Sequence, residues 1–564
     1  MKDRLCLNPV SIHPIIMSKN LFLLYVGLLF NISLFAQTIP IHHSSEGIYE
    51  FMDEMASLKL VDLNSAIKPY SRQFIADQLQ NLNEFQSLLN KRQKNQLSFY
   101  LKEFEKELGN SAIQDNLYER IRTIKHPHNR RADLFFYRDS LFTFWVNPIG
   151  GYQYYSNQNL NFHHQWVGAE AGAYIGDNWS VYVSFRDNTI SSNKMKSTEL
   201  TPEVGQDNKS GPYYSDMRGG IYYTWDWGSA GFVKDHMIWG NNYNGSTIFS
   251  GRTPSFPIFK LNLKPVKWFD FNYVHAWLIS EVVDSNRIFD FGDGAVRQEF
   301  YPKYLAANMY SFHLWKHLTA SVGNSMVYSN SNVQPAYLIP FILFKSVEHT
   351  IAASNENNAQ IFFDFSSRNI KNLHLYGTFY IDEVNFSNMF DPAKHSNWFG
   401  YKAGFRLWDF PLQNVSFTAE YTRTNPMIYK HYYPTSTFES NHYNLGHYLR
   451  DNAQQYYLSL DYLPIKNLRT KIFWQYEEKG PDYPDIRNDP NNSVLGKKFM
   501  GNVEWQNTSW GFKVSYEMFH DARIFGELIS RNITAIDQVT LDKYTASQYQ
   551  GKTFTYSLGA NFNF

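Results

Sequence analysis

The sequence predicts an all-β transmembrane protein, an antiparallel β-barrel of about 18 strands preceded by a small α-helical region. Apolar and polar residues alternate one by one through most of residues 140–564. Very short connections between these segments alternate along the chain with long polar connections. The chain ends on a further alternating segment whose last residue is Phe564. A water-soluble sandwich also alternates, but it needs no such asymmetry of turns and loops, so the pattern favours a barrel.

Residues 1–36 have the pattern of an N-terminal extension and a signal peptide. A basic residue precedes an apolar run from Leu21 to Phe35, and Ala36 ends a motif of the kind that signal peptidases cleave. The alternative is a transmembrane anchor, but the run is short and Asn31 interrupts it. We therefore expect export, cleavage after Ala36 and a final location in the cell outer membrane.

Residues 37–130 are predicted to form a helical periplasmic or plug region. Apolar residues recur at intervals of three and four in a first helix around Met52, a second that Ser71 can cap, and a third that Gly109 stops. Such stripes are typical of the core of a small bundle.

Residues 131–564 are predicted to form the outer-membrane barrel. In Trp179–Phe185 and Val415–Tyr421, apolar side chains alternate with small polar or charged ones. Each segment thus has one face for lipid and one for a wet lumen. Because a bilayer has no water to satisfy a free sheet edge, the strands must close on themselves.

The connections predict two different ends of the barrel. Short turns are expected at 175–178, 227–231, 464–467 and 506–509, and long loops at 188–214, 280–299, 424–454, 479–497 and 520–550. In outer-membrane barrels the short turns are periplasmic and the long loops extracellular. The weakest of the expected strands is Leu338–Val347.

The last residues, 553–564, are expected to be the closing strand. Phe554, Tyr556 and Leu558 share one parity and the small polar residues take the other. This strand would pair with the first one and turn its apolar face to the lipid. A terminal aromatic residue such as Phe564 is the usual end of a chain that is inserted into the outer membrane.

Three stretches depart from the plain barrel pattern: WGNNYNGSTIFSGRTPSFPIFKLNLKP (239–265), residues 335–365, and LHLYGTFYIDEV (373–384). The order W-G, two spaced serines, prolines and a later strand ending in D-E resembles the Wzi-type capsule assembly outer-membrane protein family. The segment IYEFMDEMASLKLVDLNSAIKPYSR is similar to the entry region of the Bacteroidetes-like branch of that family.

The resemblance implies a barrel that helices and loops occlude, with an outer face that binds surface polysaccharide and helps to hold a capsule to the cell. The helical residues 45–108 would occupy its periplasmic mouth. The positions that match the family pattern are Trp239, Gly240, Ser246, Ser250, Pro254, Pro257, Asp382 and Glu383.

The candidate ligand-binding residues come from these stretches. Trp239 is able to stack on a sugar ring, and Asn241 and Asn242 offer amide partners beside the hydroxyls of Ser246 and Ser250. The alternative is that the stretch only plugs the lumen, because irregular backbone is tolerated at membrane depth when protein buries it.

Asp382 and Glu383 form the second candidate group. They are able to bind a cation or sugar hydroxyls, or to pair with arginine or lysine inside the lumen, as buried carboxylates usually do.

Composition and motifs argue against several functions. Lys plus Arg and Asp plus Glu both number 52, so no nucleic-acid partner is expected. Neither a nucleophile elbow, nor a phosphate loop, nor HExxH occurs, so we expect no catalytic residues, no cofactor and no enzyme. The pairs His42–His43 and His163–His164 lack a third ligand at zinc spacing, so no metal is expected. Cys6 is the single cysteine and lies in the export segment.

The predicted function is binding of surface or capsular polysaccharide by a barrel that outer-membrane lipid surrounds. Two alternatives stay open. The first is an outer-membrane diffusion channel, which an unplugged lumen would favour. The second is a structural component of a surface adhesion or gliding machine, with periplasmic or surface protein partners.

Overall fold

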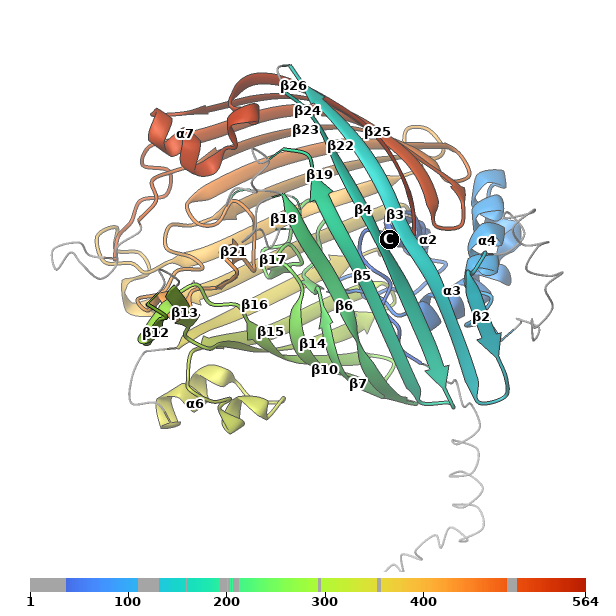
Figure 1. Cartoon of the computed structure of the whole chain (residues 1–564), viewed down its shortest axis with the longest axis horizontal. Coiled ribbons are helices and arrows are strands. Elements are labelled where there is room, and N and C mark those ends of the chain that lie inside the picture. Colours follow the sequence, from blue (N-terminus) through green and yellow to red (C-terminus); the bar gives the residue numbers. More distant parts are fainter. Residues whose placement is uncertain are drawn as a thin grey trace, which may run out of the picture.

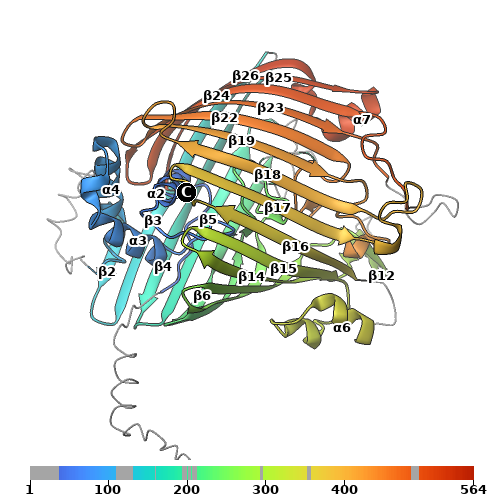
Figure 2. The ribbon, with the colours of Figure 1, turned by 180° about the vertical axis from the view of Figure 1, so that it is seen from behind.

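The computed structural model describes residues 37–109, 131–158, 160–192, 200, 203, 205, 212–292, 296–351, 357–483 and 494–563. Within these residues, eighteen strands close into an antiparallel barrel, and the three N-terminal helices gather at one end of it (Figures 1 and 2). The fold class predicted from the alternation is therefore confirmed. The expected export segment, residues 1–36, lies outside the described residues.

Each barrel strand pairs with its neighbours in chain order, and the last pairs with the first. The barrel strands are β3 (Phe142–Asn157), β4 (Leu160–Ile175), β5 (Trp179–Ile190), β6 (Tyr213–Trp225), β7 (Gly228–Asp235), β10 (Phe256–Val266), β11 (Phe269–Leu278), β14 (Lys303–Trp315), β15 (Leu318–Tyr328), β16 (Asn358–Ser367), β17 (Leu373–Glu383), β18 (Trp398–Trp408), β19 (Val415–Thr424), β22 (Ala453–Ile465), β23 (Leu468–Lys479), β24 (Trp505–Phe519), β25 (Ala522–Ala535) and β26 (Gly551–Phe562). A short strand, β2 (Phe135–Arg138), pairs with β3 beyond the end of β26.

The closing pair confirms the interpretation of the chain end. In the pairing of β26 with β3, Thr555 lies opposite Asn157. Phe554, Tyr556 and Leu558 are exposed on the outside of the barrel, while the residues between them point into the lumen and are buried. The strict alternation therefore separates a lipid-facing side from a lumenal side.

The connections divide the barrel into a short-turn end and a loop end. Turns of the kind seen at 176–178 join strands at the short-turn end. Apart from the tight turn between β3 and β4, longer connections lie at the loop end and carry small elements of their own: β12 (Val283–Asp290), β13 (Val296–Phe300), η2 (Pro335–Leu338), α6 (Phe344–Ile351), η3 (Phe386–Asn388), η4 (Pro434–Ser436), β20 (Glu439–Ser440), β21 (Tyr443–Asn444), α7 (Gln538–Tyr544) and η5 (Ser547–Tyr549).

Two predicted connections are wrong. Residues 506–509 lie inside β24 rather than in a turn, and the expected loop 520–550 contains the whole of β25. Strands β24 and β25 contain many polar residues because these side chains face the lumen. Asn507, for example, donates a hydrogen bond to Glu477 of the neighbouring strand at 2.7 Å.

The weakest predicted strand is also wrong. Leu338–Val347 contributes no barrel strand but runs through η2 and α6, outside the ring of strands (Figure 2). The outward faces of β11, β14 and β15 bury Phe344 and partly bury Ile342 and Val347, while the other apolar residues of the segment are exposed. The segment is therefore apolar without belonging to the sheet.

Three α-helices and a short 3-10 turn form a bundle at the short-turn end: α2 (Glu46–Ser57), α3 (Arg72–Asn83), η1 (Gln86–Leu88) and α4 (Lys91–Glu103). Ser71 caps α3 by accepting a hydrogen bond from the Phe74 N–H at 3.1 Å, and Asn90 begins α4 with a capping box. The Asn90 side chain also donates to Asn414 in the β18–β19 turn at 3.1 Å, which ties the bundle to the barrel. Within the described residues, no helix is long and apolar enough to span a membrane.

Candidate functional site

The tryptophan–glycine stretch lies inside the barrel. Residues 236–255, the plug loop, turn back into the lumen between β7 and β10. There β8 (Ile238–Trp239) pairs with β1 (Ile67–Lys68) and with β9 (Phe249–Ser250). Trp239 is 2% exposed, and its ring meets the ring of Phe362 edge to face. Trp239 therefore packs in an apolar core within the lumen.

Asn241 joins the plug loop to the barrel wall and to the helical region. Its backbone N–H donates to Asp364 Oδ2 at 2.9 Å, and its side-chain amide donates to the same carboxylate. Its Oδ1 accepts a hydrogen bond from Ser65 Oγ at 2.5 Å. All three groups are buried, so these bonds hold the loop in place in a region of low polarity.

The other predicted residues of the loop also bond to protein. The Asn242 amide donates to the Gly240 carbonyl at 2.8 Å, and Ser250 Oγ donates to the Leu445 carbonyl at 3.2 Å. Gly240 has a φ of +94°, and a Cβ at this position would lie 2.8 Å from Ser246 Oγ. The backbone thus requires glycine here. These contacts favour the plug interpretation of the stretch, and ligand binding by it stays a prediction.

Asp382 and Glu383 are not brought to one site. Asp382 is buried in the lumen, where its carboxylate accepts a hydrogen bond from the Tyr429 N–H at 2.5 Å. Glu383 is exposed, because successive side chains of a strand point to opposite faces. Asp382 therefore anchors the loop between β19 and β22, and the two carboxylates do not converge on a common ligand.

A third histidine lies beside His42 and His43, which the sequence did not predict. The ring of His236 has its centroid 5.5 Å from that of each of them. His42 Nδ1 lies 2.8 Å from Ser44 Oγ, and burial lowers the pKa of His43 to about 3. Among the described residues, no group of three or more such side chains is placed to hold a metal ion.

Beside the plug loop, the lumen contains a cavity of about 610 Å3. The lumenal faces of β22 to β25 and β3 form its wall, and Tyr243 and Asn244 at the tip of the plug loop face it. Further aromatic side chains line it: Tyr155, Tyr457, Phe473, Trp505, Phe525, Tyr544 and Tyr549.

Charged and amide groups lie between these rings. The Arg531 guanidinium lies 4.7 Å from the centre of the Tyr549 ring and donates to Thr555 Oγ1 at 3.3 Å. Lys513 and Glu527 form an ion pair of 3.3 Å. The amide side chains that line the cavity are those of Gln153, Asn244, Gln475, Asn507 and Gln548. The cavity thus combines flat apolar surfaces with many hydrogen-bonding groups.

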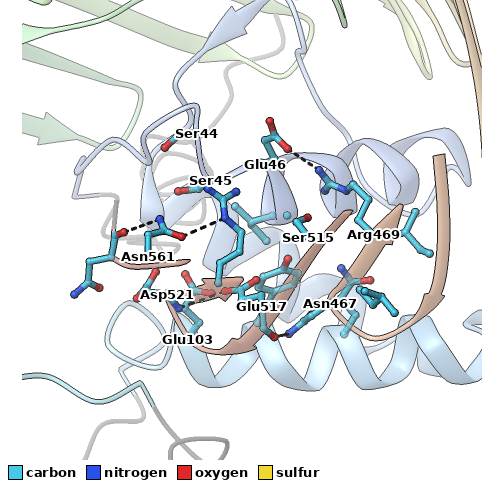
Figure 3. A pocket seen from close by; sticks show the side chains of 18 residues that line it. Ser44, Ser45, Glu46, Glu103, Asn467, Arg469, Ser515, Glu517, Asp521 and Asn561 are labelled. Carbon is cyan, nitrogen blue, oxygen red and sulfur yellow. Dashed lines mark hydrogen bonds and ion pairs between the residues drawn. The ribbon is translucent and has the colours of Figure 1, made fainter. Parts of the chain in front are cut away.

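A smaller hollow of about 100 Å3 lies at the short-turn end, between the helical bundle and the wall (Figure 3). Four residues line both this hollow and the large cavity: Glu46, Arg469, Ser515 and Arg523. Glu46 Oε2 and Arg469 Nη1 are 3.0 Å apart, and Figure 3 shows them facing each other. This ion pair stands where the two spaces adjoin.

One acidic stripe of α2 faces three arginines of the barrel. Glu46, Glu50 and Asp53 lie on one side of the helix because they are four and three residues apart. Their partners are Arg469 of β23, Arg406 of β18 and Arg368 in the β16–β17 turn. Since most of these side chains are buried, the pairs determine how the helical bundle sits in the mouth.

The Asp53 pair makes the bundle sensitive to acid. Burial by itself raises the pKa of the Asp53 carboxyl, but the charge of Arg368 outweighs burial and lowers this pKa below the usual value. A carboxyl whose pKa is lowered by folding stabilises the folded protein at pH values above its unfolded-state pKa of about 3.9. This stabilisation is lost progressively as the pH falls below that value. We expect the bundle to become protease-sensitive below about pH 4. In Asp53→Asn the bundle should be loosened at pH 7 already and should lose most of this acid dependence; an unchanged pH profile in that variant would contradict the assignment.

No sequence motif marks the large cavity. Its lining residues occupy ordinary lumenal positions, but Phe473, Phe525 and Ile529 are apolar where the alternation calls for polar side chains. Aromatic residues at lumen-facing positions of β23 and β25 were therefore the one feature of the sequence that could have indicated the cavity.

Comparison with known proteins shows similarity of fold. No protein-family model and no curated protein matches the chain. Among solved structures, the chain is similar to Wzi of Escherichia coli, described as an outer-membrane protein involved in group 1 capsule assembly and as a carbohydrate-binding β-barrel. The TM-score is 0.54 at 12% identity, over 94% of this chain and 100% of that one.

Two barrels with lower scores are also similar. OccAB2 of Acinetobacter baumannii has a TM-score of 0.42 at 9% identity, over 74% of this chain and 96% of that one. OccD3 of Pseudomonas aeruginosa has a TM-score of 0.41 at 11% identity, over 75% and 90%. Together with the closed eighteen-strand sheet of the described residues, the likeness to Wzi shows that this chain has the fold of an outer-membrane β-barrel.

Proposed function

We propose that this outer-membrane barrel binds surface polysaccharide and thereby anchors or helps to assemble a capsule or exopolysaccharide layer. The observation that carries the proposal is the lumenal cavity of about 610 Å3, with aromatic rings on its wall and amide and charged groups between them. Its size lies within the range typical of small-ligand sites, which is roughly 300–1,000 Å3. The proposed role is binding, with no chemical step.

The lining has the chemistry that a sugar chain needs. The apolar faces of sugar rings stack on aromatic side chains, and their hydroxyls exchange hydrogen bonds with amides and charged groups. At the loop end, Tyr549 and the Arg531 guanidinium that lies against it offer a flat surface beside a donor. Incoming polysaccharide would meet these residues first if the loop end faces the outside of the cell, as in other outer-membrane barrels.

Two further facts support the proposal. The structurally similar Wzi of Escherichia coli is described as a carbohydrate-binding barrel. The W-G stretch and the helical entry segment resemble the same family. In the proposed arrangement the plug loop shapes the cavity, because its tip residues Tyr243 and Asn244 face it.

The test measures binding of polysaccharide purified from the surface of the host to the protein in detergent. Tyr549→Ala is expected to weaken binding about two- to twelvefold, the loss that one aromatic contact of roughly 0.5–1.5 kcal/mol produces. The matched control is Phe85→Ala, an exposed ring in the helical region. In the host, gene deletion should release cell-bound polysaccharide. Equal binding by both variants together with unchanged retention would refute the proposal.

A second candidate function is diffusion of small solutes. It rests on the hollow at the short-turn end, which adjoins the large lumenal cavity. Because they share Glu46, Arg469, Ser515 and Arg523, rearrangement of the Glu46–Arg469 pair would join them. Planar-bilayer recordings of the purified protein distinguish the two functions. Large stable conductance of the unmodified protein would favour the channel.

A further inference from the structure

The lipid-facing wall of the barrel carries polar residues where apolar ones are expected. On β11, Asp270 faces the lumen, where it accepts a hydrogen bond from Asn64, so Tyr273 faces outward. Asn308 of β14 lies opposite Tyr273, and Asn324 of β15 lies opposite Asn308, so both asparagines face outward too. Polar side chains on this face are costly unless they find partners.

Their partners come from residues 335–348, the external strap, which includes η2 and the start of α6. The Asn308 amide donates to the carbonyls of Pro340 at 2.9 Å and Ile342 at 3.0 Å. Asn324 donates to Asn308 Oδ1 at 2.6 Å and accepts from the Phe344 N–H at 2.9 Å. The two asparagines thus form a seat for the irregular backbone of the strap.

Apolar contacts reinforce this seat. Phe341 stacks on Phe271 of β11 with ring centres 4.5 Å apart. Tyr337 and Phe344 are buried against the outer faces of β14 and β15, and the Tyr337 carbonyl accepts a hydrogen bond from Tyr273 at 2.8 Å. Figures 1 and 2 both place α6 outside the ring of strands. The strap is therefore part of the outer surface of the barrel.

The strap descends along the wall from the loop end. The Gln334 N–H donates to Tyr328 at the end of β15, and Phe344 bonds Asn324 four residues further down that strand. Four residues of a strand correspond to about 13 Å. With the usual strand tilt of about 40°, this gives roughly 10 Å of depth within an apolar band about 25 Å tall.

The outer side of the strap is apolar at this depth. Leu338, Ile339, Phe341 and Leu343 are 47%, 51%, 56% and 49% exposed. The charged residues Lys345 and Glu348 lie on α6 and pair with each other at 2.6 Å. The barrel wall on which these side chains sit faces lipid, so the strap continues a lipid-facing surface.

We propose that the external strap is inserted in the outer leaflet of the membrane and that its four exposed apolar side chains bind lipid acyl chains. The Asn308–Asn324 seat makes insertion feasible, because it supplies hydrogen bonds to backbone groups that would otherwise meet hydrocarbon. The strap would act as a lipid-binding element on the side of the barrel. It does not depend on the polysaccharide-binding role.

The test places a fluorescent probe on the strap. Because Cys6 is the single cysteine and precedes residue 37, Ile339→Cys in the mature chain gives one labelling site. Labelled with an environment-sensitive fluorophore and reconstituted in phosphatidylcholine vesicles, this site should be quenched strongly by lipids brominated on their acyl chains. Iodide in the buffer should quench it at least fivefold less than the control, Ser285→Cys, an exposed residue of the β12–β13 hairpin at the loop end.

Equal iodide quenching at both sites would overturn the proposal. So would a probe that iodide reaches in pure lipid but that is protected in native outer membranes, since a protein partner would then be the occupant. A second measurement tests the seat. In Asn308→Leu/Asn324→Leu the barrel wall stays lipid-compatible, and iodide quenching at Ile339→Cys is expected to rise severalfold. Unchanged quenching in that background would contradict the role of the asparagines.

Discussion

Asp53→Ala is expected to destabilise the docking of the helical bundle by about 3–5 kcal/mol, the usual cost of removing one partner from a buried ion pair. The replacement leaves the Arg368 guanidinium buried without its carboxylate. It also removes the acceptor of the Tyr243 hydroxyl, which bonds Asp53 at 2.5 Å. Loss of one side chain thus disturbs the helical bundle, the wall and the plug loop together.

Limited proteolysis and planar-bilayer recordings check this expectation. Cleavage between residues 37 and 109 should become much faster in Asp53→Ala, and the protein should show frequent large current steps. The matched control is Glu84→Ala, an exposed carboxylate in the same bundle. If Asp53→Ala and Glu84→Ala are equally protected and equally silent, the acidic stripe of α2 does not hold the bundle.

Leu558→Arg is expected to destabilise the barrel by about 2–4 kcal/mol, the cost of a cationic side chain near the middle of the lipid-facing wall. Leu558 is 64% exposed on the outward face of β26, the strand that closes the barrel. Its substitution should therefore impair closure as well as stability. Unfolding in urea from lipid vesicles measures the free energy, and migration with and without boiling measures closure.

Thr534→Arg is the matched control for Leu558→Arg. Thr534 faces outward on the neighbouring strand β25 but lies close to the loop end. There a charged side chain reaches water and costs only about 0–1 kcal/mol. If the two variants unfold at the same urea concentration, the wall around Leu558 does not face lipid.

The sequence predicted the barrel because its physical cause is local. A strand between lipid and a wet lumen must alternate, so residues such as Phe554 and Tyr556 carry the information themselves. The cap of α3 was predicted for the same reason, since Ser71 accepts a hydrogen bond from a backbone N–H three residues away.

The errors occurred where burial came from a distant part of the chain. In the sequence, residues 506–509 resemble a turn. In the structure they belong to a strand, and Asn507 faces the lumen, where it bonds Glu477 of the neighbouring strand. In the sequence, Leu338–Val347 resembles a strand because it is apolar. In the structure this segment packs on the outer wall of the barrel instead of joining the sheet. Neither partner is near in sequence, so no local pattern reports them.

By itself, the sequence determined a closed membrane barrel with a helical unit before it and a W-G stretch unlike its other connections. The tertiary structure alone decided that this stretch folds back into the lumen, that Asp382 and Glu383 point apart, and that a cavity remains along β22 to β25. The physical reason is that alternation fixes which side of the sheet a residue faces, whereas the occupant of the lumen depends on contacts such as Asn241 with Asp364, which closure of the barrel brings together.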